Sequence, residues 1–520
     1  MTSVSRRTFL GTAAAASVSA VAAPAMAAST SGNNLPAKWD DTVDVVVLGC
    51  GGAGMMAACQ AHDAGGKVAV YDAGQSPFHT ATNLCGGLFT AWGSKMQNAD
   101  PEGRKDSWQQ FAEDIMAYGN YMSLKEPVYC FAKNSGKAFD FLEDAGLAKH
   151  HLEPYAGHSR LRAHRQDSFK GRDYIEVLVK QLDKRGIKIN HGMGVTKFYY
   201  DPATNTVVGV QVGEGDKAKN VKANKGVIMA TGGITGTPQS LDRWVPSVAG
   251  KGVAIGGPKN DGTAMMVAVR DVGVPLSHMQ YIASYPCGIV VNGRNGPYCR
   301  WWFITNNGGI LVNKNGQRFM NEDALGGLAC ATIMHLPEKT AYCIWGANRA
   351  EAGGPWGAIN YPHGEYFTTE EVIERWDTDA DGFGIVKADT REEVISKLGL
   401  PAATIDTVER YNKMCEAGVD TDFYKTADKL ISIGADDGPF YGASFSPGFL
   451  TSLGGLRTDS DLRVLDENDQ PIEGLFNAGC MIGNFYSGTY TFAMEGMNYG
   501  ATCITLPYVL GKDLGSGKLN

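Results

Sequence analysis

The chain has 520 residues, of which 43% are hydrophobic and 20% charged, and its formal net charge is −8. This is the composition of an ordinary globular protein long enough for two or three domains, and the acidic balance argues against nucleic acid as a partner. Eleven cysteines without a C-x-x-C pair argue against a disulfide framework, and the lack of C-x-x-C-H excludes a covalently held c-type haem. We expect no metal site.

The first 28 residues are expected to be a targeting segment. Arg6 and Arg7 precede an alanine-rich apolar stretch that closes at Ala25-Met26-Ala27, a small-residue cleavage signal. Paired arginines before such a stretch indicate a twin-arginine export signal, with an ordinary secretory signal as the alternative. We therefore expect export of the folded protein to the periplasm or to the outer face of the cytoplasmic membrane. No later apolar run is long enough to span a bilayer.

After this segment the sequence predicts a strand–helix–strand unit. A β-branched run at 43–48 indicates a buried parallel strand, the alanine-rich stretch 54–64 a helix, and 67–72 a second strand. The turn Gly49-Cys50-Gly51-Gly52-Ala53-Gly54 has the form G-x-G-x-x-G, and Asp72 follows it 18 residues after Gly54. In this context the glycines let a dinucleotide pyrophosphate approach the helix N-terminus, and the acid accepts hydrogen bonds from the ribose.

Further elements follow in order along the chain. Helical patterns cover 106–145, closed by Gly146, and 174–184. Strands are expected to begin at 187–189, to form a meander at 206–212, and to be buried at 225–230.

The region 285–447 differs in character, because it is loop-rich and aromatic, and a last helix is expected over 498–510. The whole pattern predicts an α/β protein with a Rossmann-type nucleotide-binding domain.

Three later segments accompany the glycine turn: Ala230-Thr231-Gly232-Gly233, Asn260-Asp261-Gly262, and Gly474-Leu475-Phe476-Asn477-Ala478-Gly479. Together they resemble the fumarate reductase/succinate dehydrogenase flavoprotein family over about 43–511. Met279-Gln280-Tyr281-Ile282 and Gly316-Gln317-Arg318-Phe319-Met320-Asn321-Glu322 are similar to its soluble flavocytochrome branch, which includes urocanate reductase and, more remotely, 3-ketosteroid dehydrogenases.

The resemblance implies a two-part FAD-binding domain, at 36–284 and 448–515, interrupted by a mobile α+β capping domain at 285–447. The substrate is then expected between the cap and the isoalloxazine. The residues expected to bind FAD are Gly49, Gly51, Gly52, Ala53, Gly54, Asp72, Ala73, Thr80, Gly86, Gly87, Val195, Ala230, Thr231, Gly232, Asp261, Gly479, Asn498 and Tyr499.

The cofactor loops depart from the family pattern in three places. The family's G-G-N-S is replaced by Phe78-His79-Thr80-Ala81, its A-G-E by Ala478-Gly479-Cys480, and its late glycine–asparagine signature by Gly496-Met497-Asn498-Tyr499. Membrane-bound relatives hold FAD covalently through a histidine in a His-Thr pair near the first of these places. We expect non-covalent FAD, with covalent attachment at His79 as a hypothesis.

The resemblance also implies that the groups which bind a dicarboxylate are absent. The proton-donating arginine of fumarate reductases falls at Gly326, their substrate histidine at Tyr285, a histidine pair at Leu450-Thr451, and a second arginine near Met494. Because carboxylates are best held by the arginine fork, we do not expect fumarate as the substrate.

Aromatic residues stand in the same region and would suit a bulky, mostly uncharged acceptor such as an enone, a phenylpropenoid or a steroid, although they could equally pack the cap. The substrate-binding candidates are Tyr298, Trp302, Gly326, Leu450, Tyr486 and Met494. The candidates for the general acid are Tyr285, Tyr490 and Arg300.

No second nucleotide fingerprint is visible, so electrons are expected from an external donor such as a c-type cytochrome or a quinol-linked protein. The expected activity is reduction of an activated C=C bond by hydride from flavin N5. Two alternatives remain open: a dehydrogenase that runs the same chemistry backward, and a flavin protein without turnover.

Overall fold

The computed structural model describes residues 35–519, apart from 156, 169, 237, 247–252, 255–261, 292–293, 300–307, 325, 348–357, 361–364, 367–383, 487–493 and 495. Only the backbone is described at 238, 253–254, 284–291, 294–299, 326–327, 358–360 and 365–366. The predicted targeting segment lies outside the described residues. Within the described part of the chain, none of the helices is both long and apolar enough to cross a membrane.

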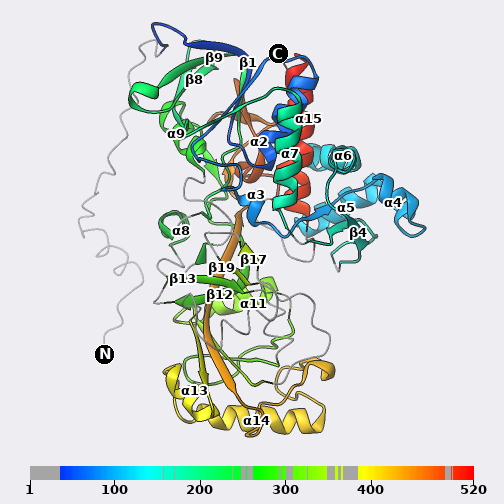
Figure 1. The fold of residues 1–520 in the computed structure, drawn as a ribbon, viewed down its shortest axis with the longest axis vertical. Helices are drawn as coiled ribbons and strands as arrows, with labels where there is room; N and C mark the ends of the chain where they lie inside the picture. Colours follow the sequence, from blue (N-terminus) through cyan, green and yellow to red (C-terminus); the bar gives the residue numbers. More distant parts are fainter. Residues whose placement is uncertain are drawn as a thin grey trace, which may run out of the picture. The chain divides into compact units, whose positions relative to one another are not determined.

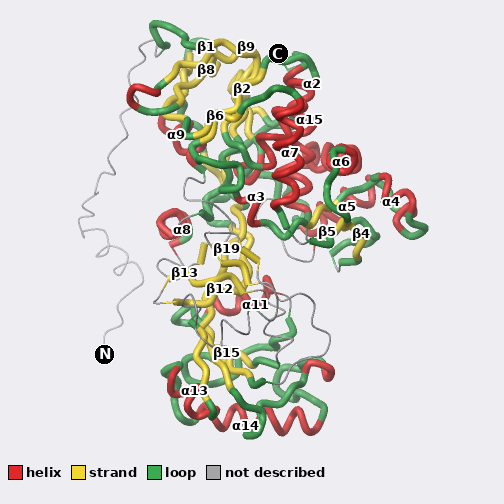
Figure 2. The backbone as a smooth tube through the Cα atoms, viewed as in Figure 1, coloured by secondary structure: helices red, strands yellow, loops and turns green. Residues whose placement is uncertain are grey.

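The first sheet is the predicted Rossmann-type core, shown in Figure 1 and Figure 2. β1 (Asp41–Leu48) pairs in parallel with β2 (Val68–Asp72) on one side and with β9 (Lys219–Met229) on the other. β6 (Ile189–His191) extends the sheet beyond β2. The carboxyl ends of these parallel strands lie at one edge of the sheet, where nucleotides bind in such folds.

A meander and a late strand complete this sheet on the side of β9. β7 (Val195–Asp201) and β8 (Thr206–Val212) are antiparallel to each other, and β8 is antiparallel to β9. β22 (Pro471–Asn477) pairs in parallel with β9 and carries β21 (Arg463–Leu465) at its outer edge. A segment from the C-terminal part of the chain thus becomes part of the same sheet as β1.

Three helices pack together beside this sheet: α2 (Gly52–Asp63), α7 (Arg172–Lys184) and α15 (Leu506–Gly515). α2 and α15 approach closely because small residues face each other. A Cβ added at Gly511 would collide with the backbone of Ala57, and one at Gly515 with that of Ala61. The spacing of four residues on both helices keeps these contacts in register.

The segment before α7 forms a helical layer with a small antiparallel sheet. The sequence predicted continuous helix over 106–145, but the structure has two helices there, α5 (Trp108–Tyr118) and α6 (Lys125–Asp144). The break has a local cause, because Asn120 and Tyr121 adopt left-handed backbone angles. The shorter elements here are α3 (Ala81–Leu84), β3 (Leu88–Thr90), α4 (Lys95–Ala99), β4 (His150–Glu153) and β5 (Ala163–Gln166).

The second sheet takes most of its strands from the region predicted to be loop-rich, where long connections separate them. Its strand order is β14-β15-β19-β12-β13-β16-β17, with β10 and β18 also paired to β19. The strands are β10 (Val253–Ala254), β12 (Ile282–Val291), β13 (Arg294–Cys299), β14 (Ile310–Val312), β15 (Ala341–Trp345), β16 (Ala358–Asn360), β17 (Glu365–Tyr366), β18 (Ile385–Ala388) and β19 (Phe440–Ser452). β19 lies at the centre of this sheet. The predicted domain boundaries at 285 and 447 fall inside β12 and β19, and they stay a prediction.

The helices of this part and of its connections are α8 (Pro238–Trp244), α9 (Thr263–Asp271), α11 (Gly326–His335), α13 (Arg391–Lys397) and α14 (Thr404–Ala417). The two-residue strands β11 (Leu276–Ser277) and β20 (Gly455–Leu456) pair near the return to the first sheet. The predicted last helix exists but begins as a π-helix over Tyr499–Thr505 before it continues as α15.

A buried ion cluster ties the loop after β14 to α14 and the segment that follows it. Arg318 donates to Glu322 at 3.0 and 2.8 Å and to Asp420 at 2.9 Å, and all three side chains are almost fully buried. Lys425 lies 3.7 Å from Glu322, and burial lowers the pKa of its ammonium. Burial opposes ionisation of Asp420, but the hydrogen bonds from Arg318 outweigh it and lower the pKa of its carboxyl to about 2.

Replacing Arg318 with methionine should destabilise this part of the protein strongly, because two buried carboxylates lose their partner. The expected loss in the free energy of unfolding is about 3–5 kcal/mol, measured by chemical denaturation. Arg410→Met is the matched control, since Arg410 pairs with Asp422 at the surface, and it should cost about 1 kcal/mol or less. Equal losses in the two variants would contradict the assignment.

Acid should weaken the same cluster in a defined range. Because the folded pKa of Asp420 is below its unfolded value of about 4, its contribution is present above pH 4 and is lost as the pH falls through about 2. An Asp420→Asn variant should therefore show a flatter stability profile between these two values.

Candidate functional site

The glycine turn after β1 is shaped by contacts that exclude side chains. Gly49 has a positive φ of 106°, and a Cβ there would overlap the carbonyl oxygen of Ala230 at the end of β9. A Cβ on Gly54 would overlap the carbonyl oxygen of Gly49. The turn therefore brings the N-terminus of α2 to the edge where β1, β2 and β9 end, which is the geometry for holding a pyrophosphate.

An unpaired hydroxyl group lies at that helix N-terminus. Gly52 donates its N–H to Thr82 Oγ1 at 2.9 Å, and a Cβ on Gly52 would lie 3.0 Å from the hydroxyl oxygen of Tyr499. Tyr499 is buried, and its hydroxyl has no well-directed hydrogen-bond partner among the described residues, although Thr82 lies nearby. Burial raises the pKa of this phenol well above its usual value, so it stays a neutral donor. A buried, unpaired donor at this place fits a ligand phosphate.

The acid of the fingerprint stands at the end of β2. Asp72 accepts hydrogen bonds from the backbone N–H of Cys50 at 2.9 Å and of Gly74 at 2.6 Å. Cys50, Asp72 and His191 place possible metal-ligating atoms within 4.8 Å of one another. Burial and the negative charge of Asp72 raise the pKa of the Cys50 thiol far above its usual value. Asp72 stands at the position where the fingerprint predicts a ribose ligand, and that role stays a prediction.

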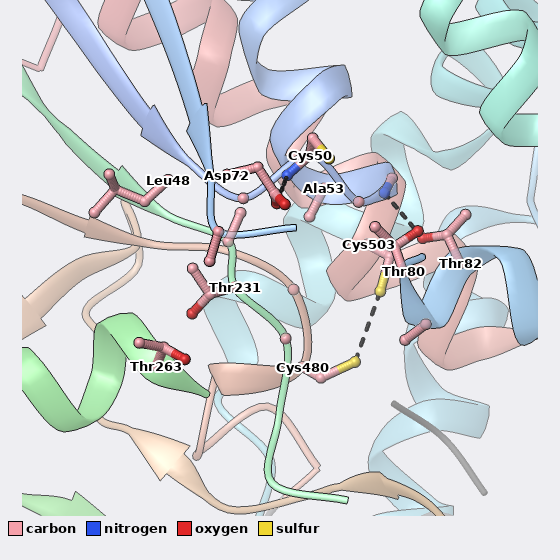
Figure 3. Close-up of a pocket in the computed structure, with 18 of the residues that line it drawn as sticks. Leu48, Cys50, Ala53, Asp72, Thr80, Thr82, Thr231, Thr263, Cys480 and Cys503 are labelled. Carbon is pink, nitrogen blue, oxygen red and sulfur yellow. Dashed lines mark hydrogen bonds between the residues drawn. The ribbon is translucent and has the colours of Figure 1, made fainter. Parts of the chain in front are cut away.

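One cavity joins these features, and Figure 3 shows the side chains around it. The predicted cofactor residues that line it are Gly49, Gly51, Gly52, Ala53, Asp72, Ala73, Thr80, Val195, Ala230, Thr231, Gly232 and Gly479. They lie in the turn after β1 and at the start of α2, at the end of β2 and before α3, at the start of β7, and in the turns after β9 and β22. Segments far apart in sequence therefore meet here.

Other predicted cofactor residues lie near the cavity without lining it. Gly54 packs on Gly49, and Asn498 and Tyr499 lie at the start of the π-helix. Gly87 has a positive φ of 71°, and its carbonyl accepts a hydrogen bond from the Tyr174 hydroxyl at 3.1 Å. Gly86 is exposed in the same loop, and Asp261 lies outside the described residues.

Several lining residues were not predicted: Leu48, Cys50, Tyr71, Ala81, Thr82, Gly194, Thr263 and Cys503. Thr263 directly follows the Asn260-Asp261-Gly262 segment, so its position could have been read from that motif. Cys503 lies on the π-helix, and no spacing in the sequence connects it with the glycine turn. His79 and Cys480, which the sequence marked as departures from the family, both line the cavity.

The candidates for substrate chemistry are only partly described. Tyr285 and Tyr298 lie in β12 and β13, where only the backbone is described, and Gly326 begins α11. Tyr490, Arg300 and Trp302 lie outside the described residues.

Three further substrate candidates have described side chains. Tyr486 is buried and donates to Asn498 Oδ1 at 3.2 Å, Met494 is fully buried, and Leu450 is half-buried in β19.

β19 brings the second sheet to the cavity. Its last residue, Ser452, donates from its hydroxyl to the carbonyl of Cys480 at 3.2 Å. A Cβ on Gly233 would collide with the side chain of Ser452. The strand that carries Leu450 and Thr451 therefore ends against the loops that form the cofactor cavity.

Comparison with known proteins agrees with this geometry. The model of the FAD binding domain family matches residues 44–495. An NADH:fumarate oxidoreductase of Klebsiella pneumoniae is 28% identical over 467 residues, which cover 89% of this chain and 47% of that protein, so the chain spans about half of that relative's length.

Two further comparisons cover more of the other protein. A digoxin reductase of Eggerthella lenta is 27% identical over 532 residues, covering 93% of this chain and 91% of the relative. The open conformation of a flavocytochrome c3 fumarate reductase superposes with a TM-score of 0.74 at 23% identity, covering 93% of this chain and 80% of that chain. The chain therefore has the fold of that reductase.

The described residues fit FAD. The glycine turn leaves space for a pyrophosphate, the Tyr499 hydroxyl offers it a donor, and Asp72 offers the ribose an acceptor. When bound, FAD supplies hydride transfer.

Tyr499→Phe should weaken FAD binding while leaving the fold intact, because it removes only the unpaired hydroxyl. We expect about a tenfold higher Kd, the loss of one hydrogen bond to a charged group, measured by fluorescence titration of the apoprotein with FAD. Tyr508→Phe is the control, since Tyr508 packs on Phe141, whereas the Tyr499 hydroxyl lies against Gly52 of the glycine turn. An unchanged Kd for FAD in Tyr499→Phe would show that the Tyr499 hydroxyl does not contact the cofactor.

Proposed function

Because the chain belongs to the FAD binding domain family, we propose that it is a flavin-dependent reductase of an activated C=C bond in a bulky, mostly uncharged organic acceptor. The observation that carries the proposal is the chemistry at the four places where fumarate reductases hold a dicarboxylate. Gly326, Tyr285, Leu450-Thr451 and Met494 stand there, and none of them is a cation. Met494 is also fully buried, so it offers no polar contact to a ligand.

The described arginines near β14 do not fill this gap. Arg318 is committed to Glu322 and Asp420, and Arg391 pairs with Glu409 at 2.7 Å. Both are buried among their partners, so neither is free to bind a carboxylate. This supports an acceptor that is recognised by shape and apolar contact rather than by charge.

Within this proposal the protein has to orient the acceptor and to deliver a proton. Tyr285 stands in β12 opposite Gly448 of β19, the strand that ends at the cofactor cavity. Its place on this central pair of strands supports it as a candidate general acid, together with Tyr490 and Arg300. The external electron donor, a c-type cytochrome or a quinol-linked protein, remains part of the proposal.

The acceptor class can be tested with anaerobic holoenzyme and reduced methyl viologen. Enones, cinnamates and steroid enones are compared with fumarate by the rate of viologen oxidation. We expect kcat/KM for fumarate to be at least about 100-fold below that of the best uncharged acceptor, as the loss of two charge-assisted hydrogen bonds predicts. Comparable turnover of fumarate would contradict the proposal.

The same assay identifies the general acid among the three candidates and distinguishes a reductase from the two alternative functions. Tyr285→Phe, Tyr490→Phe and Arg300→Lys are measured singly with flavin content determined, and loss of the acid should lower kcat by about 100-fold or more. Reduction of the enzyme-bound flavin by a saturated substrate, without turnover of any unsaturated acceptor, would instead favour a dehydrogenase. Photoreduced enzyme that no acceptor reoxidises would favour a protein without turnover.

We also propose that FAD is held non-covalently. His79 is exposed and lines the cavity, so covalent attachment to it is the competing hypothesis. On a denaturing gel under ultraviolet light, the wild-type band should show no flavin fluorescence. A fluorescent band that disappears in His79→Ala would overturn this and assign the covalent bond to His79.

A further inference from the structure

Two cysteine thiols lie in contact inside the cofactor cavity. Cys480 Sγ and Cys503 Sγ are 3.8 Å apart, and both residues line the cavity, as Figure 3 shows. Cys480 follows Gly479 in the turn after β22, and Cys503 lies on the π-helix. These segments meet only in the folded protein, so the pair is a product of the tertiary structure.

The surroundings of the pair make its two members chemically different. Asn498 directs its Nδ2 to Cys480 Sγ at 3.6 Å. The orientation of this amide is fixed, because Asn498 Oδ1 accepts from the Tyr486 hydroxyl at 3.2 Å and from the Thr502 hydroxyl at 3.1 Å. The Asn498 amide thus points at Cys480, while the Thr502 hydroxyl lies 3.8 Å from the Cys503 sulfur.

The pKa values of the two thiols also differ, and in opposite directions. The contact between the two sulfur atoms lowers the pKa of the Cys480 thiol and raises the pKa of the Cys503 thiol. One thiolate beside one thiol is the arrangement from which a disulfide forms and is reduced again, because the thiolate is the reacting species.

The position of Cys480 adds a reason to expect function rather than packing. It stands where the related flavoproteins have the acid of their A-G-E motif, at the edge of the flavin site. None of the nine cysteines with described side chains is in a disulfide, and Cys480 and Cys503 both line the cavity with their sulfur atoms in contact. A disulfide requires a sulfur–sulfur distance of about 2.05 Å, so closure needs only a small movement of the side chains.

We propose that Cys480 and Cys503 are a redox-active dithiol that exchanges two electrons with the FAD bound in the same cavity. In one direction the two S–H bonds are replaced by one S–S bond, and the two electrons and two protons convert FAD to FADH2. In the other direction FADH2 becomes FAD and the disulfide returns to two thiols. The holoenzyme then stores four electrons for each chain instead of two.

The test is an anaerobic reductive titration of the holoenzyme, with no organic acceptor present. The protein is first oxidised with a small-molecule disulfide, desalted, and titrated with dithionite while the flavin absorbance is followed. The wild type should take up about four electrons per flavin, two for the cofactor and two for the disulfide. Cys480→Ser and Cys503→Ser should each take up about two, and the control Cys130→Ser, on α6 outside the cavity, about four. Uptake of about two electrons by the wild type would overturn the proposal.

A second measurement does not depend on how well the variants fold. Oxidised wild-type protein is digested, and the peptides that carry Cys480 and Cys503 should be found linked and lighter by the mass of two hydrogens. Illumination of the holoenzyme with EDTA, which reduces bound flavin, should return both cysteines to alkylatable thiols. Apoprotein treated in the same way should keep the disulfide. Loss of the disulfide in apoprotein at the same rate would show that the electrons do not come through FAD.

The proposal rests on FAD binding, which the Tyr499→Phe titration tests separately. It is independent of the acceptor, because electrons are counted without one. A wrong acceptor class would therefore leave the electron count at about four, whereas a purely structural thiol pair would leave acceptor turnover intact and give a count of about two.

Discussion

The rest of the structure depends on the close approach between the glycine turn and the two parallel strands that flank β1. Gly54 packs on the carbonyl of Gly49, and Gly49 packs on the carbonyl of Ala230, with no room for a side chain at either glycine. These contacts fix the N-terminus of α2 at the edge of the sheet. A charged pyrophosphate can then be held by backbone N–H groups, without a cationic side chain.

The C-terminal segment completes what this turn begins. β22 joins the first sheet beside β9, and α15 packs on α2 through Gly511 and Gly515. The return of the chain carries Gly479, Cys480, Tyr499 and Cys503 to the same cavity or its edge. The second sheet lies between these segments in sequence, and β19 reaches the cavity's edge through the hydrogen bond from Ser452 to Cys480.

Charge is distributed unevenly between the two sheets. Around the cofactor cavity the described polar groups are mostly neutral: threonine hydroxyls, the Tyr499 phenol and the thiol of Cys503, with Asp72 occupied by backbone donors. Beside the second sheet, buried charges are paired in the cluster around Arg318 and in the pair of Arg391 with Glu409.

The sequence by itself determined the nucleotide fold. The β-branched run before the glycine turn, the alanine-rich helix and Asp72 act over a short stretch, where local geometry and hydrophobic periodicity are decisive. It also identified Cys480 and His79 as departures from the family, because these stand inside motifs. It missed the strands within 285–447, which pair across long distances and carry little local signal. It also missed the break at Asn120 and Tyr121, whose left-handed angles interrupt a helical pattern.

Only the tertiary structure decided which distant side chains meet. The contact between Cys480 and Cys503, the unpaired Tyr499 hydroxyl at the N-terminus of α2, and the arrival of Ser452 at the cavity all join segments that no spacing relates. The physical reason is that Tyr499 and Cys503 are carried by the helix that docks on α2, Cys480 follows β22 docked on β9, and Ser452 arrives at the end of β19. Such docking depends on the fit of small residues across two elements rather than on the pattern within either one.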